Sequence, residues 1–163
     1  MNPLGVCLLC SKFNNRRATQ SVAFLRFVGK FSGLYPEGDP YLALRIDEMV
    51  DACGDFVNIL LPSIMEKDRD KRMKMRAKLM EQESGPVRKW LRGAENLLVQ
   101  HGGPFAIGPR MTIADLSIQN LFKWISSGIE GVPITLINDE DCPMLKKLKD
   151  KLEHLDCWDL EYR

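Results

Sequence analysis

Two polar residues, Gln20 and Ser21, stand directly before an apolar helical pattern, and they are the first residues of this chain at which chemistry could take place. The first amides of a helix have no acceptors within the helix and lie at the positive end of its dipole, so a helix that begins here favours a bound carboxylate. The simpler interpretation is that Ser21 is only an N-cap residue. From the residues alone, the N-cap interpretation is favoured.

Three aspartates, Asp47, Asp51 and Asp55, recur at every fourth position of a second helical pattern. This spacing puts their carboxylates on one helix face, where like charges repel by roughly 0.2–0.5 kcal/mol per pair. Such a cluster either binds a positively charged group or forms a solvated stripe with lysine or arginine neighbours. The solvated stripe is the usual fate of charges in this pattern.

The remaining reactive residue types indicate no catalytic group and no metal site. The five cysteines are scattered and odd in number, which is typical of free thiols in a reducing compartment and therefore predicts a cytoplasmic protein. The Cys7–Cys10 pair has redox spacing, but no strand pattern precedes it. The two histidines, His101 and His154, are too far apart in the sequence to predict a ligand pair or a triad.

The charge pattern predicts neither nucleic-acid nor membrane binding. The net charge is +1, and the basic run of residues 67–78 is interleaved with acids and lacks aromatic side chains, so we interpret it as a solvated helix face. The apolar run of residues 4–9 is too short to cross a bilayer and lacks the features of a secretory signal.

Apolar periodicity predicts helices for most of the 163 residues and strands for none. Residues 1–19 have no period, so we expect a short irregular leader there. The expected helices run from Ser21 to Gly33, from Asp39–Pro40 to about Ile64 with a kink at Pro62, from Asp68 to His101 as one long helix that is irregular at residues 84–86, from Thr112 to about Ser126, and from about Pro143.

The helix that begins at Thr112 has the most specific sequence signal. In the stretch F-A-I-G-P-R-M-T-I-A-D-L of residues 105–116, Thr112 and Asp115 form a capping box, and Met111 and Leu116 form a hydrophobic staple. The residues that follow are apolar on more than one side, which is typical of a central helix. The fold class predicted is therefore all-α, a helical bundle around this capped helix.

Five motifs occur in an order that resembles the C-terminal helical domain of glutathione transferases, and is most similar to the sigma-like class that includes glutathione-dependent prostaglandin D synthases. The motifs are Q-S-V-A-F-L-R-F at 20–27, G-L-Y at 33–35, I-D-E-M-V-D-A-C-G-D-F at 46–56, T-I-A-D-L at 112–116 and C-P-M-L-K-K-L-K at 142–149. The resemblance implies that residues 20–163 form this domain. Residues 1–19 are then a remnant or replacement of the family's thioredoxin-like half, and paired strands among them would argue against this division.

The resemblance also implies a function and a set of site residues. The complete protein would conjugate glutathione, as co-substrate, to small hydrophobic electrophiles. Gln20 and Ser21 would hold the γ-glutamyl end of glutathione, and Asp55 would reach the γ-glutamyl amino group across a dimer. The residues implied for the electrophile pocket, for most of which core packing is the alternative role, are Phe56, Val57, Leu60 and Leu61.

The chain departs from the family pattern in ways that limit what can be transferred. The strands and the tyrosine, serine or cysteine that activate the thiol have no counterpart in residues 1–19, so we assign no catalytic residue and expect the isolated chain to be weak or inactive. Gly54 stands where some relatives have an acid beside a metal site, so we predict no metal. The alternative function is a non-catalytic helical interaction module. In either case we expect a second copy or a partner protein to cover the face left exposed.

Overall fold

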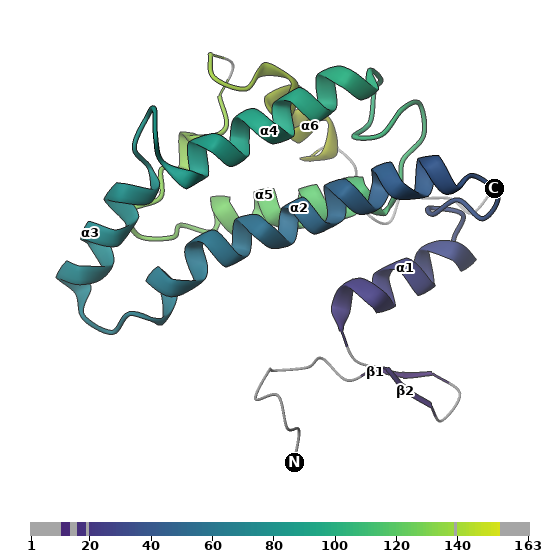
Figure 1. Cartoon of the computed structure of the whole chain (residues 1–163), viewed down its shortest axis with the longest axis horizontal. Coiled ribbons are helices and arrows are strands. Elements are labelled where there is room, and N and C mark those ends of the chain that lie inside the picture. Colours follow the sequence, from purple (N-terminus) through teal and green to yellow (C-terminus); the bar gives the residue numbers. More distant parts are fainter. Residues whose placement is uncertain (1–10, 14–15, 19, 139, 154–163) are drawn as a thin grey trace.

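Six helices form most of the part of the chain that the structure describes, which comprises residues 11–13, 16–18, 20–138 and 140–153 of a computed structural model (Figure 1). They are α1 (Ser21–Phe31), α2 (Pro40–Met65), α3 (Arg69–Leu79), α4 (Pro86–His101), α5 (Ile113–Ser126) and α6 (Pro143–Glu153), with a short 3₁₀ helix at Ile134–Leu136. The predicted all-α class is confirmed.

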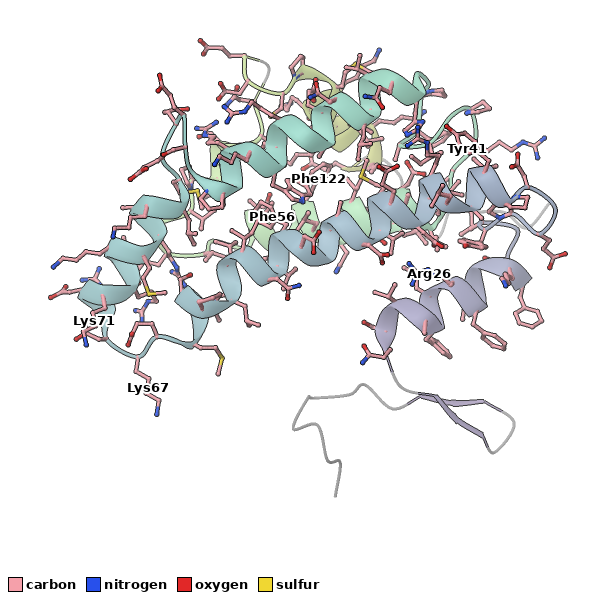
Figure 2. All side chains as sticks on the ribbon, viewed as in Figure 1. Arg26, Tyr41, Phe56, Lys67, Lys71 and Phe122 are labelled. Carbon is pink, nitrogen blue, oxygen red and sulfur yellow. The ribbon has the colours of Figure 1, made fainter. Side chains whose placement is uncertain are left out.

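The helix α5 lies at the centre of the bundle and contacts α1, α2 and α6. It buries residues on several sides, as its all-round apolar sequence predicts: Ile113, Ala114, Asp115, Ile118, Gln119, Leu121, Phe122 and Ile125. In Figure 2 the labelled side chains of Phe56 from α2 and Phe122 from α5 lie in the interior between the helices. The core is therefore built around α5, and the other helices are positioned against it.

The predicted capping box at the start of α5 is present. The carboxylate of Asp115 accepts the amide of Thr112 at 2.8 Å, and the Thr112 hydroxyl oxygen accepts the amide of Ala114 at 3.2 Å. The other Asp115 oxygen accepts the amide of Ala106 at 2.7 Å, so the carboxylate also holds the loop that precedes the helix. Asp115 is fully buried. Burial raises its pKa, while these hydrogen bonds act in the opposite direction.

The helix α2 begins as its sequence predicts, with Asp39 as N-cap and Pro40 in the first turn. The Asp39 carboxylate accepts the amides of Tyr41 and Leu42 at 3.1 and 2.9 Å. The helix continues to Met65 with Pro62 inside its last turn. Its length lets one element contact α5, α4 and α3 in succession.

The prediction of one long helix from Asp68 to His101 is wrong, because the chain breaks between α3 and α4. The break covers residues 80–85 and ends at Gly85, whose amide donates to the Glu81 carbonyl at 3.1 Å. A Cβ atom at residue 85 would lie 2.5 Å from that carbonyl oxygen and 2.6 Å from that of Leu79. Only glycine fits this tight turn, and Pro86 then begins α4. The irregularity expected at residues 84–86 is thus a full helix boundary.

The expectation of a leader without strands is also wrong. Strands β1 (Ser11–Phe13) and β2 (Arg16–Ala18) form an antiparallel hairpin directly before α1 (Figure 1). Each strand has three residues, which is too short for a period of two to be recognised in the sequence. These paired strands argue against the division at residue 19, as stated above. No other observation tests the division, which stays a prediction.

Candidate functional site

A groove with a volume of about 410 Å³ lies between α1, α2 and α5. Most of its lining is apolar, and the polar groups come from two serines, an asparagine and a cysteine. The lining residues are Ser21, Val22, Leu25, Val50, Cys53, Gly54, Val57, Leu116, Ser117, Asn120, Leu121 and Trp124. A concave apolar surface with a few polar groups is the usual form of a small-molecule site.

Ser21 lines this groove at the start of α1, and Gln20, which is not among the lining residues, directly precedes it. Gln20 is the N-cap and has φ 77° and ψ 107°, the single positive φ of a non-glycine residue in the described chain. Its side chain makes no capping hydrogen bond, so α1 begins without a side-chain acceptor for its first amides. Backbone in this sparsely populated region costs about 1–3 kcal/mol and is concentrated at functional sites. Ser21 is exposed and lines the groove.

The position of α1 is fixed by a charged network on α2. In Figure 2 the Arg26 side chain points from α1 toward α2. Its Nε donates to Asp47 at 2.6 Å and its Nη2 to Asp51 at 2.8 Å, while the Tyr35 hydroxyl donates to the other Asp47 oxygen at 2.9 Å. Partial burial lowers the pKa of Arg26, but the two carboxylates outweigh this effect and the pKa is raised.

The aspartate stripe is therefore divided. Asp47 and Asp51 have the arginine neighbour that the solvated-stripe interpretation requires, whereas Asp55 is exposed and accepts no hydrogen bond from another described residue. Asp55 is not among the residues that line the groove. Its assignment to glutathione stays a prediction.

The four residues assigned to the electrophile pocket are spread over different environments. Val57 lines the groove. Phe56 and Leu60 are fully buried in the core, and Phe56 packs edge-on against Trp90 with ring centroids 4.8 Å apart. Leu61 is exposed on α2 outside the groove lining. The structure thus brings Val57 together with Ser21, and it does not bring the other three to the same surface.

Cys53 is the one thiol in the groove lining, and its environment disfavours the reactive thiolate. Burial raises its pKa to about 12, because a charged sulfur would lose its hydration there. A nucleophilic or thiol-activating role would need a lowered pKa. The groove therefore offers binding surface and no activated nucleophile of its own.

Two kinds of site are absent from the described residues. No group of three or more histidine, cysteine, aspartate or glutamate side chains is placed to hold a metal ion there. In the same part of the chain, no helix combines the length and the apolar character needed to cross a bilayer.

Sequence reasoning missed the wall that α5 contributes. Ser117, Asn120, Leu121 and Trp124 follow one another at spacings of three, one and three residues, which places them on one face of the helix. The sequence did contain a signal, because a helix expected to be central carries polar and aromatic residues along one face. Arg26 was also missed, because its partners are more than twenty residues away in the sequence.

A family profile described as "Glutathione S-transferase, C-terminal domain" matches residues 54–156. The match spans more than half of the chain, so the chain belongs to the glutathione S-transferase family through this C-terminal domain. No curated protein matches the sequence significantly.

Solved structures with the same fold include prostaglandin synthase D of Nilaparvata lugens, with 18% identity and a TM-score of 0.72 over 90% of this chain and 68% of that one. Rat hPGDS complexed with a quinoline has 19% identity and a TM-score of 0.67 over 90% and 67%. A monomeric glutathione S-transferase from the hookworm Necator americanus has 19% identity and a TM-score of 0.64 over 88% and 67%. The chain thus spans about two thirds of the length of these proteins.

Proposed function

We propose that this chain supplies the helical part of a sigma-like glutathione transferase that, in its complete form, conjugates glutathione to small hydrophobic electrophiles. The observation that carries the proposal is the groove, which places Ser21 at the first turn of α1 on the same surface as Val57 of α2 and the apolar wall of α5. A glutathione carboxylate would accept the free first amides of α1. The apolar group of the electrophile would lie along the groove beside the sulfur.

The sigma-like class is supported by the fold shared with two prostaglandin synthase structures. The quinoline bound by the rat protein is a small aromatic molecule, which is the kind of compound that a groove with Trp124 in its lining would accept. The free thiols of Cys53 and Cys142 support a cytoplasmic location.

Titration of the purified chain with S-hexylglutathione tests this proposal, because the probe carries both the tripeptide and an apolar group. We expect the tryptophan fluorescence of the chain to change on binding, because Trp124 lines the groove. Ser21→Ala should weaken binding by about two- to tenfold, since one hydrogen bond contributes roughly 0.5–1.5 kcal/mol. Ser126→Ala is the matched control, because Ser126 is an exposed helical serine outside the groove lining. Conjugation of a chloronitrobenzene should be slow or undetectable in the isolated chain. Absence of probe binding at millimolar concentration would contradict the proposal.

The alternative, a non-catalytic helical interaction module, is favoured by one observation. The C-terminal half of α2 exposes four apolar side chains at helical spacing, Val57, Leu61, Ile64 and Met65. Surfaces of this kind mark interfaces when they are contiguous. A chain that binds no S-hexylglutathione but forms a defined complex would favour this alternative.

A homodimer or a protein partner is also part of the proposal, because the exposed apolar side chains would be covered in either assembly. One similar structure is described as monomeric, so the fold is compatible with a single copy. Sedimentation velocity over a hundredfold range of concentration tests this point. A single monomeric species at every concentration would exclude the homodimer and leave only the protein partner.

A further inference from the structure

The helix α3 places its arginines on the side that faces the bundle. Arg69 and Arg72 pair with Glu130 at 2.7 and 3.2 Å. Arg76 is buried, donates to the Ser63 hydroxyl at 3.2 Å and also donates to the Glu130 carbonyl. These three cations are therefore used to attach α3 to α2 and to the segment after α5.

The lysines of the same region lie on the opposite side. Lys71, Lys74 and Lys78 of α3 are separated by three and four residues, which aligns them along one helix face, and Lys67 lies in the turn directly before the helix. All four are exposed. None of the four forms an ion pair with a carboxylate of the described residues. In Figure 2 the labelled Lys67 and Lys71 extend away from the bundle at its outer end. We call these four residues the lysine stripe.

Three acids lie near the lysine stripe in the sequence, and none of them pairs with one of its lysines. The carboxylate of Glu66 accepts the amide of Asp68 at 2.9 Å, and that of Asp68 accepts the amide of Lys71 at 2.9 Å, so both are turned toward the backbone at the start of α3. Asp70 is the acid of α3 closest to the stripe by helical spacing, four residues before Lys74. The four lysines outnumber these three acids, and the three lysines on the face of α3 outnumber Asp70, so the face stays positive.

Two exposed apolar side chains precede the stripe in the chain. Ile64 is 40% and Met65 is 72% exposed at the end of α2, directly before the turn that carries Lys67. Apolar side chains beside a row of lysines are the combination that binds the interface of an anionic bilayer, because the lysines meet the headgroups while the apolar groups enter the boundary with the acyl chains. Nucleic acid is disfavoured, since no aromatic side chain accompanies the stripe to stack on bases.

We propose that the lysine stripe, together with Ile64 and Met65, docks this protein on the surface of an anionic lipid bilayer. The occupant is the bilayer surface, with its phosphate and carboxylate headgroups along α3. The sequence alone predicts a solvated basic face and no membrane contact. The separation of lysines from arginines on α3 and the exposure of Ile64 and Met65 change that interpretation. The inference does not depend on glutathione binding.

Co-sedimentation with sonicated vesicles tests the proposal, using phosphatidylcholine alone and a mixture of three parts phosphatidylcholine to one part phosphatidylserine. We expect binding to the mixed vesicles only, weakened by added salt. A Lys67→Gln, Lys71→Gln, Lys74→Gln, Lys78→Gln variant should lose about fivefold in the binding constant for each lysine replaced. An Ile64→Ser, Met65→Ser variant should also bind the mixed vesicles more weakly than the wild-type protein when both are measured at one salt concentration.

The matched control replaces four exposed lysines that lie elsewhere: Lys30, Lys89, Lys123 and Lys147. It has the same net charge as the stripe variant, so it should bind the mixed vesicles clearly better than that variant does. Equal losses in the two variants, no binding of the wild-type protein at low salt, or equal binding to both vesicle compositions would each overturn the proposal. Displacement from the vesicles by inorganic phosphate at physiological concentration, or tighter binding to duplex RNA through the stripe, would overturn it as well. Circular dichroism of each variant shows whether it is folded.

Discussion

Single residues in this structure differ in local stability: Gln20, in the proposed site, is strained, whereas Asp115, in the core, is well satisfied. Gln20 takes a backbone conformation that L-residues rarely adopt and gains no capping hydrogen bond from it. Asp115, by contrast, satisfies three donors while fully buried. The difference is informative because backbone strain that no hydrogen bond of the same residue offsets is concentrated at functional sites.

Replacement of Gln20 by glycine should therefore raise stability while it weakens the proposed site. Glycine adopts φ near 77° without a steric penalty, so we expect the free energy of unfolding to increase by about 1 kcal/mol. Removal of the side-chain amide should weaken S-hexylglutathione binding. Urea unfolding and fluorescence titration measure the two effects. Gln20→Ala, which keeps the strain and loses the amide, should weaken binding without the gain in stability.

The thiol of Cys53 predicts a dependence of stability on pH. Its pKa is about 12 in the folded protein and near the ordinary value of 9.0 in the unfolded chain. Between these values the folded state keeps a proton that the unfolded state releases, so the contribution is complete below about pH 9 and is lost as the pH rises toward 12. In this range the free energy of unfolding falls with a slope that approaches about 1.4 kcal/mol per pH unit.

Urea unfolding of the wild-type protein and of Cys53→Ala between pH 7 and 10 measures this contribution. The wild-type advantage should shrink above pH 9, because the variant lacks the thiol. Cys142, whose pKa burial also raises, is present in both proteins and cancels in the comparison. Parallel stability curves would show that Cys53 ionises freely in the folded state.

At the scale of elements, the sequence predicts the helices whose ends are set by local chemistry. Asp39 with Pro40, Thr112 with Asp115, and Pro143 mark the starts of three helices as observed. The break before Gly85 and the hairpin before α1 have no comparable local signal in the sequence. Gly85 depends on backbone atoms of Leu79 and Glu81 that approach only after folding, and each strand is three residues long.

The start of α6 depends on a carboxylate from another helix, which no local pattern could reveal. Glu95 of α4 accepts the amides of Met144 and Leu145 at 2.7 and 2.9 Å. Glu95→Ala should lower the free energy of unfolding by about 1–2 kcal/mol, because two helix amides lose their acceptor. Glu95→Gln keeps one acceptor oxygen and should cost less.

Thermal unfolding followed by circular dichroism measures this order of stabilities. Glu83→Ala is the matched control, because Glu83 is an exposed glutamate whose side chain makes no hydrogen bond to another described residue. We expect its unfolding temperature to stay at the wild-type value. A Glu95→Ala variant as stable as this control would contradict the capping role.

At the scale of the whole molecule, α1 has the fewest contacts with the other helices, and the proposed site depends on it. It packs against α5 at Gly29, where a Cβ atom would lie 2.6 Å from Ile113 Cγ2, and the Leu34 carbonyl after it accepts the Ile113 amide at 3.0 Å. The ion pairs of Arg26 with Asp47 and Asp51 attach α1 to α2. The sequence predicts both the helix and the aspartate stripe, but pairing across more than twenty residues requires the fold.

Replacement of Arg26 by glutamine should therefore release α1 locally and leave the bundle intact. The paired side chains are partly exposed, so we expect a loss of about 1 kcal/mol, confined to the opening of α1. Hydrogen exchange should show faster exchange of the α1 amides and unchanged protection in α5. Arg45→Gln, which removes an ion pair within α2, is the control and should leave α1 protected. Uniformly faster exchange in both helices would mean that α1 and the bundle unfold as one unit. The proposed site on α1 would then be as rigid as the core, and the ion pairs of Arg26 would not set the local opening of α1.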